Sequence, residues 1–75
     1  MNKVVAVFES TRAAISAERF CTTGGVSCQV IPLPRDISSD CGIALEIAEG
    51  DRGVVERIFG QEKLKVRYYN KKNLV

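Results

Sequence analysis

Cys41 is the residue of this sequence that is best placed for chemistry, because it lies in a polar, turn-forming segment and directly precedes Gly42. The segment, residues 32–42, separates two runs that have the composition of strands. A thiol acts as a nucleophile or as a sulfur carrier only when it is exposed and partly ionised near neutral pH. Gly42 has no side chain, so a partner can approach the thiol closely from that side. We therefore predict that Cys41 is the catalytic residue.

Several groups around Cys41 could stabilise a thiolate, a persulfide or an oxyanion. Arg35 carries a full positive charge, serine hydroxyls can donate hydrogen bonds, and successive backbone N–H groups can form an anion-binding nest. A helix that starts near residues 10–11 would add a partial positive charge. Asp36 and Asp40 act in the opposite direction, so we expect only a modest lowering of the thiol pKa. The candidate binding residues are Arg35, Ser38, Ser39, Gly42, Ser10 and Thr11.

The rest of the composition excludes several kinds of site. The chain has no histidine, so it cannot form a histidine-based catalytic dyad or triad by itself. Its three cysteines have spacings that match no zinc or haem motif, and we expect no metal and no cofactor. Cys21 and Cys28 are predicted to be buried, inert thiols. A redox pair of Cys28 with Cys41 is conceivable, but no geometry in the sequence supports it.

Charge and hydropathy favour neither a nucleic acid nor a membrane as a partner. The net charge is +2, and no apolar run approaches the ~20 residues that span a bilayer. Tyr68 and Tyr69 lie among basic residues, but RNA-binding domains with a four-stranded sheet carry their aromatic residues on the central strands. No export signal is recognisable at the start of the chain, so the expected compartment is the cytoplasm.

The 75 residues are predicted to form one domain, residues 1–75, whose residues 70–75 make a frayed tail. One helix begins at Ser10 or Thr11 and ends at Gly24–Gly25, and a second follows Asp51 and stops at Gly60. Apolar runs with the periodicity of strands occupy residues 3–8, 26–33, 43–48 and 65–69. The prolines of the second run and the alternating charges of the last run predict that both are edge strands.

The order βαββαβ favours the ferredoxin-like sandwich, an α+β fold with a four-stranded antiparallel sheet and both helices on one face. The first two strands are then parallel, so the start of the first helix (residues 10–12) is expected close to residues 35–42. Ile47, Phe20 and Phe59 are expected in the core between helices and sheet. The other sheet face would be apolar and bare, and a homodimer through it is a further expectation.

Two segments resemble a known family of small bacterial proteins, the selenium/sulfur carrier protein-like family. Residues 34–42 fit its Pro-Arg-x-Ile-Ser-Ser-x-Cys-Gly segment, and residues 8–14 fit the Phe-x-Ser-Thr-x-x-Ala start of its first helix. The likeness extends over residues 3–69. The chain departs from the family pattern at the glycine pair that ends the first helix, at Gly53 and in its basic tail, which bear on packing more than on the site.

The resemblance implies a cytoplasmic, bacterial carrier in which Cys41 holds sulfur or selenium as a persulfide or selenosulfide. Its partners would be proteins that donate and accept sulfur or selenium. Whether the chain is an enzyme is left open. The residues alone also allow a non-catalytic regulatory module whose loop binds an anion or a protein and in which Cys41 is incidental. The exposure and reactivity of the Cys41 thiol separate these two hypotheses.

Overall fold

The predicted helices and strands form in the predicted order in the computed structural model of the chain, which describes residues 3–35, 37 and 42–70. The strands are β1 (Lys3–Phe8), β2 (Cys28–Pro32), β3 (Ile43–Ala48) and β4 (Val66–Asn70). The helices are α1 (Thr11–Thr23) and α2 (Arg52–Gln61), and a short 3₁₀ helix, η1 (Glu49–Asp51), precedes α2. Several boundaries differ from the prediction by one or two residues. For example, β2 starts at Cys28, because residues 24–27 finish the helix and turn the chain, and α2 continues through Gly60.

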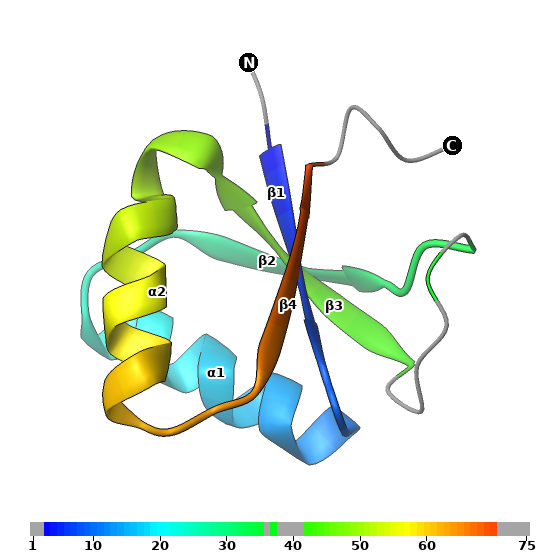
Figure 1. Cartoon of the computed structure of the whole chain (residues 1–75), viewed down its shortest axis with the longest axis horizontal. Coiled ribbons are helices and arrows are strands. Elements are labelled where there is room, and N and C mark those ends of the chain that lie inside the picture. Colours follow the sequence, from blue (N-terminus) through cyan, green and yellow to red (C-terminus); the bar gives the residue numbers. More distant parts are fainter. Residues whose placement is uncertain (1–2, 36, 38–41, 71–75) are drawn as a thin grey trace.

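The four strands form one sheet in the order β2-β3-β1-β4, and every neighbouring pair is antiparallel (Figure 1). The predicted α+β class, with a four-stranded antiparallel sheet and two helices, is confirmed. The order also confirms that β2 and β4 are the edge strands. Among the described residues, no helix is both long enough and apolar enough to cross a membrane.

Local sequence signals fix both ends of α1. The Ser10 hydroxyl oxygen accepts a hydrogen bond from the Ala13 N–H at 3.1 Å, which satisfies a donor that the first helical turn would otherwise leave free. At the other end, Gly25 has a φ of 80°, a left-handed conformation that glycine adopts without strain. The Val26 N–H then donates to the Cys21 carbonyl at 2.8 Å, as in a Schellman motif. This turn delivers the chain into β2.

One buried cluster joins both helices to the sheet. The Phe8 and Phe59 rings meet in it edge to face, with their centroids 5.5 Å apart and their planes at 76°. The core positions predicted for Ile47 and Phe59 are confirmed. The buried members of the cluster are Ala6, Phe8, Leu45 and Ile47 from β1 and β3, Ala14, Ala17 and Cys21 from α1, Val55 and Phe59 from α2, and Val26.

The core position predicted for Phe20 is wrong, because the structure leaves this side chain only partly buried. The neighbouring Cys21 is fully buried instead. Successive residues of a helix differ by ~100° in direction. The buried stripe of α1 consists of Ala14, Ala17 and Cys21, so Phe20 lies at the margin of that stripe. The apolar character of Phe20 was read correctly, but its angular position on the helix was not.

The opposite face of the sheet is covered rather than bare. Val5 and Val7 of β1 and Ala44 of β3 are at most 1% exposed on this face, and they pack with Ile37, which is 6% exposed. Leu33 and Ile31 pack against the same cluster. Residue 37 belongs to the connection between β2 and β3. The bare face that motivated the expected homodimer is therefore absent from the described part of the chain.

We expect Phe59→Ala to lower the free energy of unfolding by ~3–5 kcal/mol, because it removes a ring from the centre of the buried cluster. Phe20→Ala is the matched control, since it deletes the same group from a partly buried position; its cost should stay below ~2 kcal/mol. Urea unfolding of both variants measures the difference. Equal losses would contradict the assignment of Phe59, and not Phe20, to the core.

Ile37→Ala should cost ~2–4 kcal/mol, because this side chain seals the outer face of the sheet over Val5 and Val7. Ile15→Ala, at a position on α1 that is 48% exposed, is the control and should cost less than ~1 kcal/mol. Sedimentation of the Ile37→Ala protein should also reveal self-association through the uncovered valines. An Ile37→Ala protein as stable as the Ile15→Ala protein would show that the connection does not cover the sheet in solution.

Candidate functional site

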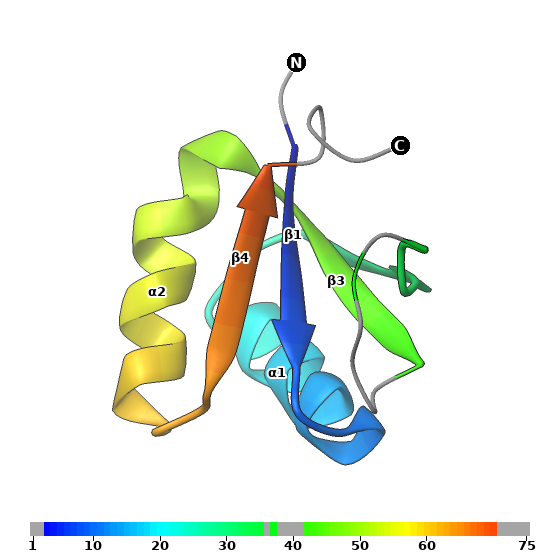
Figure 2. The same cartoon turned by 45° about the vertical axis from the view of Figure 1, so that its right-hand side comes forward.

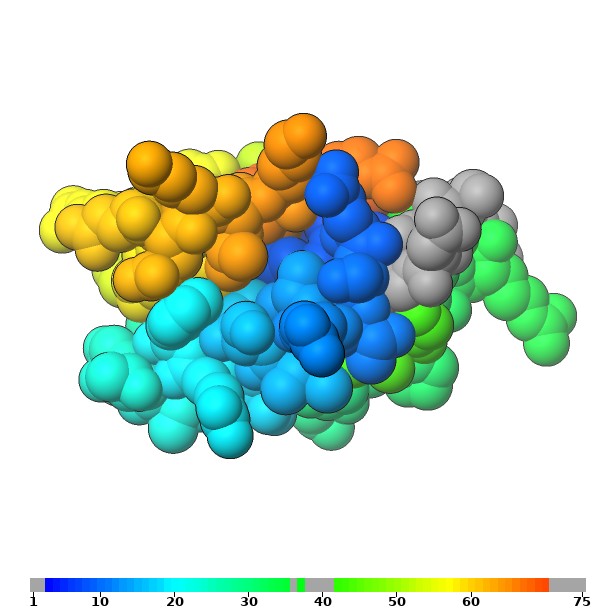
Figure 3. Space-filling model, turned by 90° about the horizontal axis from the view of Figure 1, so that it is seen from below, coloured from blue at the N-terminus to red at the C-terminus, as the bar shows by residue number. Residues whose placement is uncertain are grey.

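The backbone places the two segments of the predicted site, the start of α1 and the residue before β3, where strands β1, β2 and β3 end on the same side of the sheet. β1 and β3 are antiparallel, with Ala6 opposite Leu45, so the end of β1 lies beside the start of β3. Pro32, the last residue of β2, lies opposite Ile43, the first residue of β3. Residues 10–11, which follow β1, and Gly42, which precedes β3, therefore leave the sheet at the same edge. Figure 3 shows the blue surface of the first turn of α1 next to the bright green surface at the start of β3.

Ser10 and Thr11 are exposed at this edge. The Ser10 hydroxyl oxygen caps α1, and the Ser10 carbonyl accepts from the Ala14 N–H at 3.1 Å. The hydroxyl hydrogen of Ser10 remains able to donate. Thr11 is the first residue of the helix, where the partial positive charge of the helix dipole favours an anion. The predicted helix start is thus present, and the binding roles of Ser10 and Thr11 stay predictions.

Arg35 is exposed, and two anchors flank it in the chain. On one side the Leu33 N–H donates to the Gly42 carbonyl at 3.2 Å, which closes the base of the connection between β2 and β3. On the other side the Ile37 N–H donates to the Pro34 carbonyl at 3.1 Å. In Figures 1 and 2 residues 33–35 lie away from the first turn of α1. The start of β3, but not the segment of residues 33–35, thus lies near the start of α1.

The centre of the predicted site, Cys41 with Ser38 and Ser39, lies outside the described residues, as do Asp36 and Asp40. Its described neighbour Gly42 is exposed, and a Cβ atom built there would meet nothing within 4 Å. Space is therefore open on the glycine side, as the sequence predicted. The roles of the other residues in this segment stay predictions.

The structure brings together two residues that the sequence gave no functional role. Cys28 packs against the buried cluster that contains Cys21. Cys21 is fully buried on α1, as predicted, and Cys28 is half-buried on the edge strand β2. Cys28 lies opposite Ile47, whose side chain belongs to the cluster beneath the helices. In the sequence, each cysteine lies on the apolar side of its own helix or strand. The turn at residues 24–27 directs these two apolar sides toward each other, and this orientation cannot be read from the periodicity of either element.

Burial governs the acidity of this pair. The pKa of the Cys21 thiol is raised from 9.0 to about 12, mainly by burial and to a smaller extent by the neighbouring Cys28. Burial also raises the pKa of the Cys28 thiol, although the neighbouring Cys21 lowers it in part. Both groups are therefore neutral thiols at physiological pH, as expected for inert buried cysteines.

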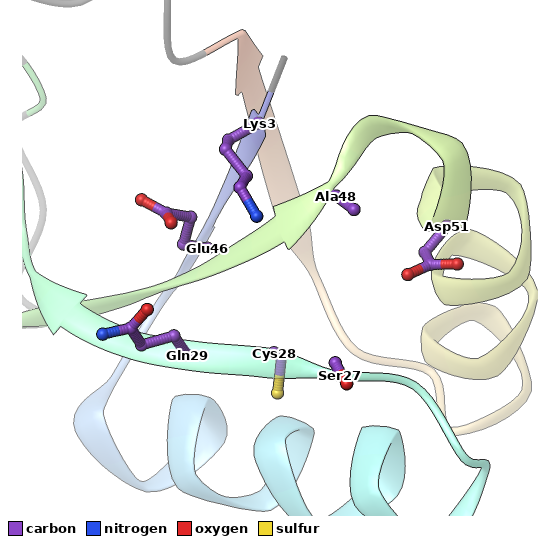
Figure 4. Close-up of a pocket in the computed structure, with 7 residues that line it drawn as sticks. All are labelled: Lys3, Ser27, Cys28, Gln29, Glu46, Ala48 and Asp51. Atoms are coloured by element: carbon purple, nitrogen blue, oxygen red, sulfur yellow. The ribbon is translucent and has the colours of Figure 1, made fainter. Parts of the chain in front are cut away.

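An open pocket of about 230 Å³ lies at the other end of β2 and β3. Its charged residues are Lys3, Glu46 and Asp51, and Cys28 contributes to its wall. Figure 4 shows the Cys28 sulfur pointing toward α1, away from the charged side chains of Lys3 and Glu46. The pocket is separated from the predicted site by the length of β2, about 13 Å at the usual rise per strand residue. Its full lining is Lys3, Ser27, Cys28, Gln29, Glu46, Ala48 and Asp51.

The same strand length separates the two regions that hold cysteines. Cys28 pairs with Ile47 at one end of β3, whereas Gly42, next to Cys41 in the chain, precedes the other end. A disulfide requires Cα atoms within ~7 Å of each other. The described strands thus offer no support for a pair of Cys28 with Cys41. Across the described residues, no three side chains of the His, Cys, Asp or Glu type gather to hold a metal ion.

Comparison with known proteins identifies a family over most of the chain. A family model described as "Putative Se/S carrier protein-like" matches residues 3–70, which include both segments of the predicted site. Searches of curated proteins and of solved structures found no match.

Alkaline pH should destabilise the protein through Cys21. Because its folded-state pKa is raised from 9.0 to about 12, the stabilising effect of the neutral thiol is complete below pH 9 and is lost as the pH rises toward 12. The loss should approach ~1.4 kcal/mol per pH unit. Cys28 and Tyr68, whose pKa values burial also raises, add losses of the same sign.

Urea unfolding at neutral pH and at pH values above 9, for the parent and for Cys21→Ala, isolates the effect of Cys21. The variant should be less stable at neutral pH, because it leaves a small cavity, but its stability should fall less steeply as the pH rises. Parallel curves for the two proteins would mean that the folded state does not favour the neutral form of Cys21.

Proposed function

This chain belongs to the Se/S carrier protein-like family, and we propose that it carries sulfur or selenium on the thiol of Cys41. The family match over residues 3–70 is the observation on which this proposal rests. In sulfur loading, the Cys41 thiolate attacks the outer sulfur of a donor persulfide, the donor thiolate leaves, and Cys41 becomes the persulfide. Attack by an acceptor thiolate on that outer sulfur passes it on and restores Cys41. Selenium would follow the same route as a selenosulfide.

The other two thiols support the choice of Cys41 by their environment. Burial raises the pKa of Cys21 to about 12 and also raises the pKa of Cys28, so neither supplies much thiolate at neutral pH. Transfer of sulfur between proteins further requires that the carrying sulfur reach a partner. Cys21 is fully buried, whereas Gly42, the neighbour of Cys41, is exposed.

The residues at the sheet edge receive roles that fit an anionic sulfur. The start of α1 at Ser10 and Thr11 would provide the positive end of a helix dipole. Arg35 would provide a full positive charge, and its long side chain could extend toward the thiol. The Ser38 and Ser39 hydroxyls would donate hydrogen bonds, and Gly42 would leave room for a partner. The partners on this proposal are donor and acceptor proteins in the cytoplasm, without nucleic acid or membrane.

The fold we assign to this carrier is the ferredoxin-like sandwich with both helices on one face. The sheet order β2-β3-β1-β4 supports the assignment. A single cluster that contains side chains of α1, α2 and alternate residues of β1 and β3 supports it as well.

Alkylation at neutral pH, followed per cysteine by peptide mapping, tests the proposed thiol. Cys41 should react at least ~10-fold faster than Cys21 and Cys28, whose thiolate fractions are lower. Arg35→Ala should slow the reaction of Cys41 several-fold, whereas Arg57→Ala, which removes an exposed arginine from α2, should leave it unchanged. Comparable rates for Cys41 and the buried cysteines in the folded protein would contradict the proposal.

A persulfide-transfer assay then tests the function itself. Cys41→Ser should abolish loading from a persulfide donor, and Cys28→Ser, which removes a different thiol, should retain it. If Cys41→Ser loads as well as the parent, the carrier hypothesis fails. The alternative of a non-catalytic module that binds an anion or a protein would then stand.

A further inference from the structure

The two edge strands of the sheet differ in what they offer to a further strand. Leu33 lies opposite Gly42 by the register that pairs β2 with β3, and its N–H donates to the Gly42 carbonyl at 3.2 Å. Along an antiparallel pair, residues that exchange hydrogen bonds alternate with residues whose N–H and C=O groups point away from the partner strand. Cys28, Val30 and Pro32 are therefore the residues of β2 whose backbone groups point outward. Pro32 has no N–H, so a further strand would find this edge interrupted.

The same alternation leads across the sheet to β4. The odd-numbered residues of β3 pair with even-numbered residues of β1, and the odd-numbered residues of β1 are left to bond with β4. Arg67 and Tyr69 lie opposite these residues, so their backbone groups are used within the sheet. The N–H and C=O groups of Val66 and Tyr68 point outward instead, and neither residue is a proline, so β4 is the edge that can accept a further strand. Figure 2 shows β4 beside β1 at the margin of the sheet, and in Figures 1 and 2 no other described helix or strand crosses in front of it.

The side chains of β4 give its two faces different characters. Val66 and Tyr68 pack against the cluster beneath the helices, and the Arg52 guanidinium lies over the Tyr68 ring, 5.2 Å from its centroid. Lys65, which precedes the strand, and Arg67 are exposed, and their side chains alternate with those of Val66 and Tyr68. A strand added at this edge would thus have a valine and an aromatic ring as neighbours on one face and positive charges on the other.

We propose that β4 binds an extended acidic segment of a partner protein as a fifth, antiparallel strand. Backbone hydrogen bonds to Val66 and Tyr68 would supply affinity, as in other complexes in which a peptide extends a sheet. Directly opposite side chains share a face, so apolar side chains of the segment would lie beside Val66 and Tyr68, and carboxylates beside Lys65 and Arg67. The segment that fits this edge is therefore one in which acidic and apolar residues alternate.

Charge also argues against a second copy of the chain as the occupant. In an antiparallel pair of β4 strands centred on Arg67, the two Arg67 side chains would lie opposite each other, and like charges in this position are destabilising. Basic side chains on edge strands oppose pairing with identical strands in general. An acidic segment turns the same charges into attractions.

Binding at β4 does not depend on the thiol of Cys41. The segment that contains Cys41 connects β2 and β3, and β1 separates β3 from β4 in the sheet. Binding can therefore be measured in the parent and in the Cys41→Ser protein with the same expected result. Failure of strand addition would leave the carrier hypothesis standing, and failure of sulfur transfer would leave strand addition standing.

The experiment uses the full-length protein and a fluorescent eight-residue peptide in which glutamate and valine alternate. Fluorescence anisotropy at low salt should show saturable binding, and the same peptide with lysine in place of glutamate should bind at least ~10-fold more weakly. Hydrogen exchange followed by NMR should become slower at the Val66 and Tyr68 amides when the peptide is bound, and should stay unchanged at the Val30 amide of the other edge. Absence of saturable binding, or protection of Val30 in place of Tyr68, would overturn the proposal.

Methylation of single peptide nitrogens tests the geometry without changing the protein. In the antiparallel pair the valines lie opposite Val66 and Tyr68, so the valine N–H groups point to β4 and the glutamate N–H groups point away. Methylation of a central valine nitrogen should weaken binding at least ~10-fold, because a hydrogen bond is lost and the methyl group meets a carbonyl of β4. Methylation of a central glutamate nitrogen should leave the affinity almost unchanged. Equal losses from the two methylations would rule out an added antiparallel strand.

Lys65→Glu tests the charge of the edge. It should weaken binding of the glutamate–valine peptide by ~5-fold or more at low salt. Arg19→Glu is the matched control, because it makes the same change in net charge at an exposed position on α1, and it should change the affinity by less than ~2-fold. Equal weakening by the two variants would mean that the peptide senses only the net charge of the protein, and the assignment of β4 as its site would fail.

Discussion

Burial of the two central strands on both of their faces is the constraint on which the rest of the structure depends. Five consecutive residues of β1, Val4–Phe8, are buried. Alternate residues of a strand point to opposite faces, so a continuously buried strand requires a cover on each side. The helices contribute to one cluster through residues such as Phe59, and the connection between β2 and β3 contributes Ile37 to the other. A domain of this size reaches a two-sided core only because that connection packs.

The same connection therefore has two tasks that place different demands on its residues. Its apolar members, Leu33 and Ile37, hold it against the outer face of the sheet, and the Leu33–Gly42 hydrogen bond closes its base. Its remaining residues are polar or small, and they are the ones to which the carrier function is assigned. A loop that is already held at its ends and near its middle loses less conformational entropy when a partner binds it. Structural anchoring and presentation of a thiol are thus compatible in one short segment.

The sequence predicted those features that depend on neighbours along the chain. The Ser10 cap, the glycine pair that ends α1 and the edge position of β2 follow from capping and proline rules, and the structure confirms them. Ile37 was missed as a core residue because it is a single apolar residue in a polar loop, where no period exists to indicate a face. The packing of Cys28 against the cluster that contains Cys21 was missed because it depends on how a turn aligns a helix with a strand. Residues 38–41, the centre of the candidate site, lie outside what the structure describes.

The fold separates its thiols by environment as well as by distance. Cys21 and Cys28 lie between α1 and the sheet, where low polarity favours the neutral thiol. At the other end of β2, the start of α1 is exposed and the space at Gly42 is open. Because a neutral thiol neither attacks nor accepts a persulfide readily, sulfur loaded at the exposed edge would not leak to the buried pair. One small domain can in this way hold an exposed carrier thiol and two neutral, buried or half-buried cysteines without a reaction between them.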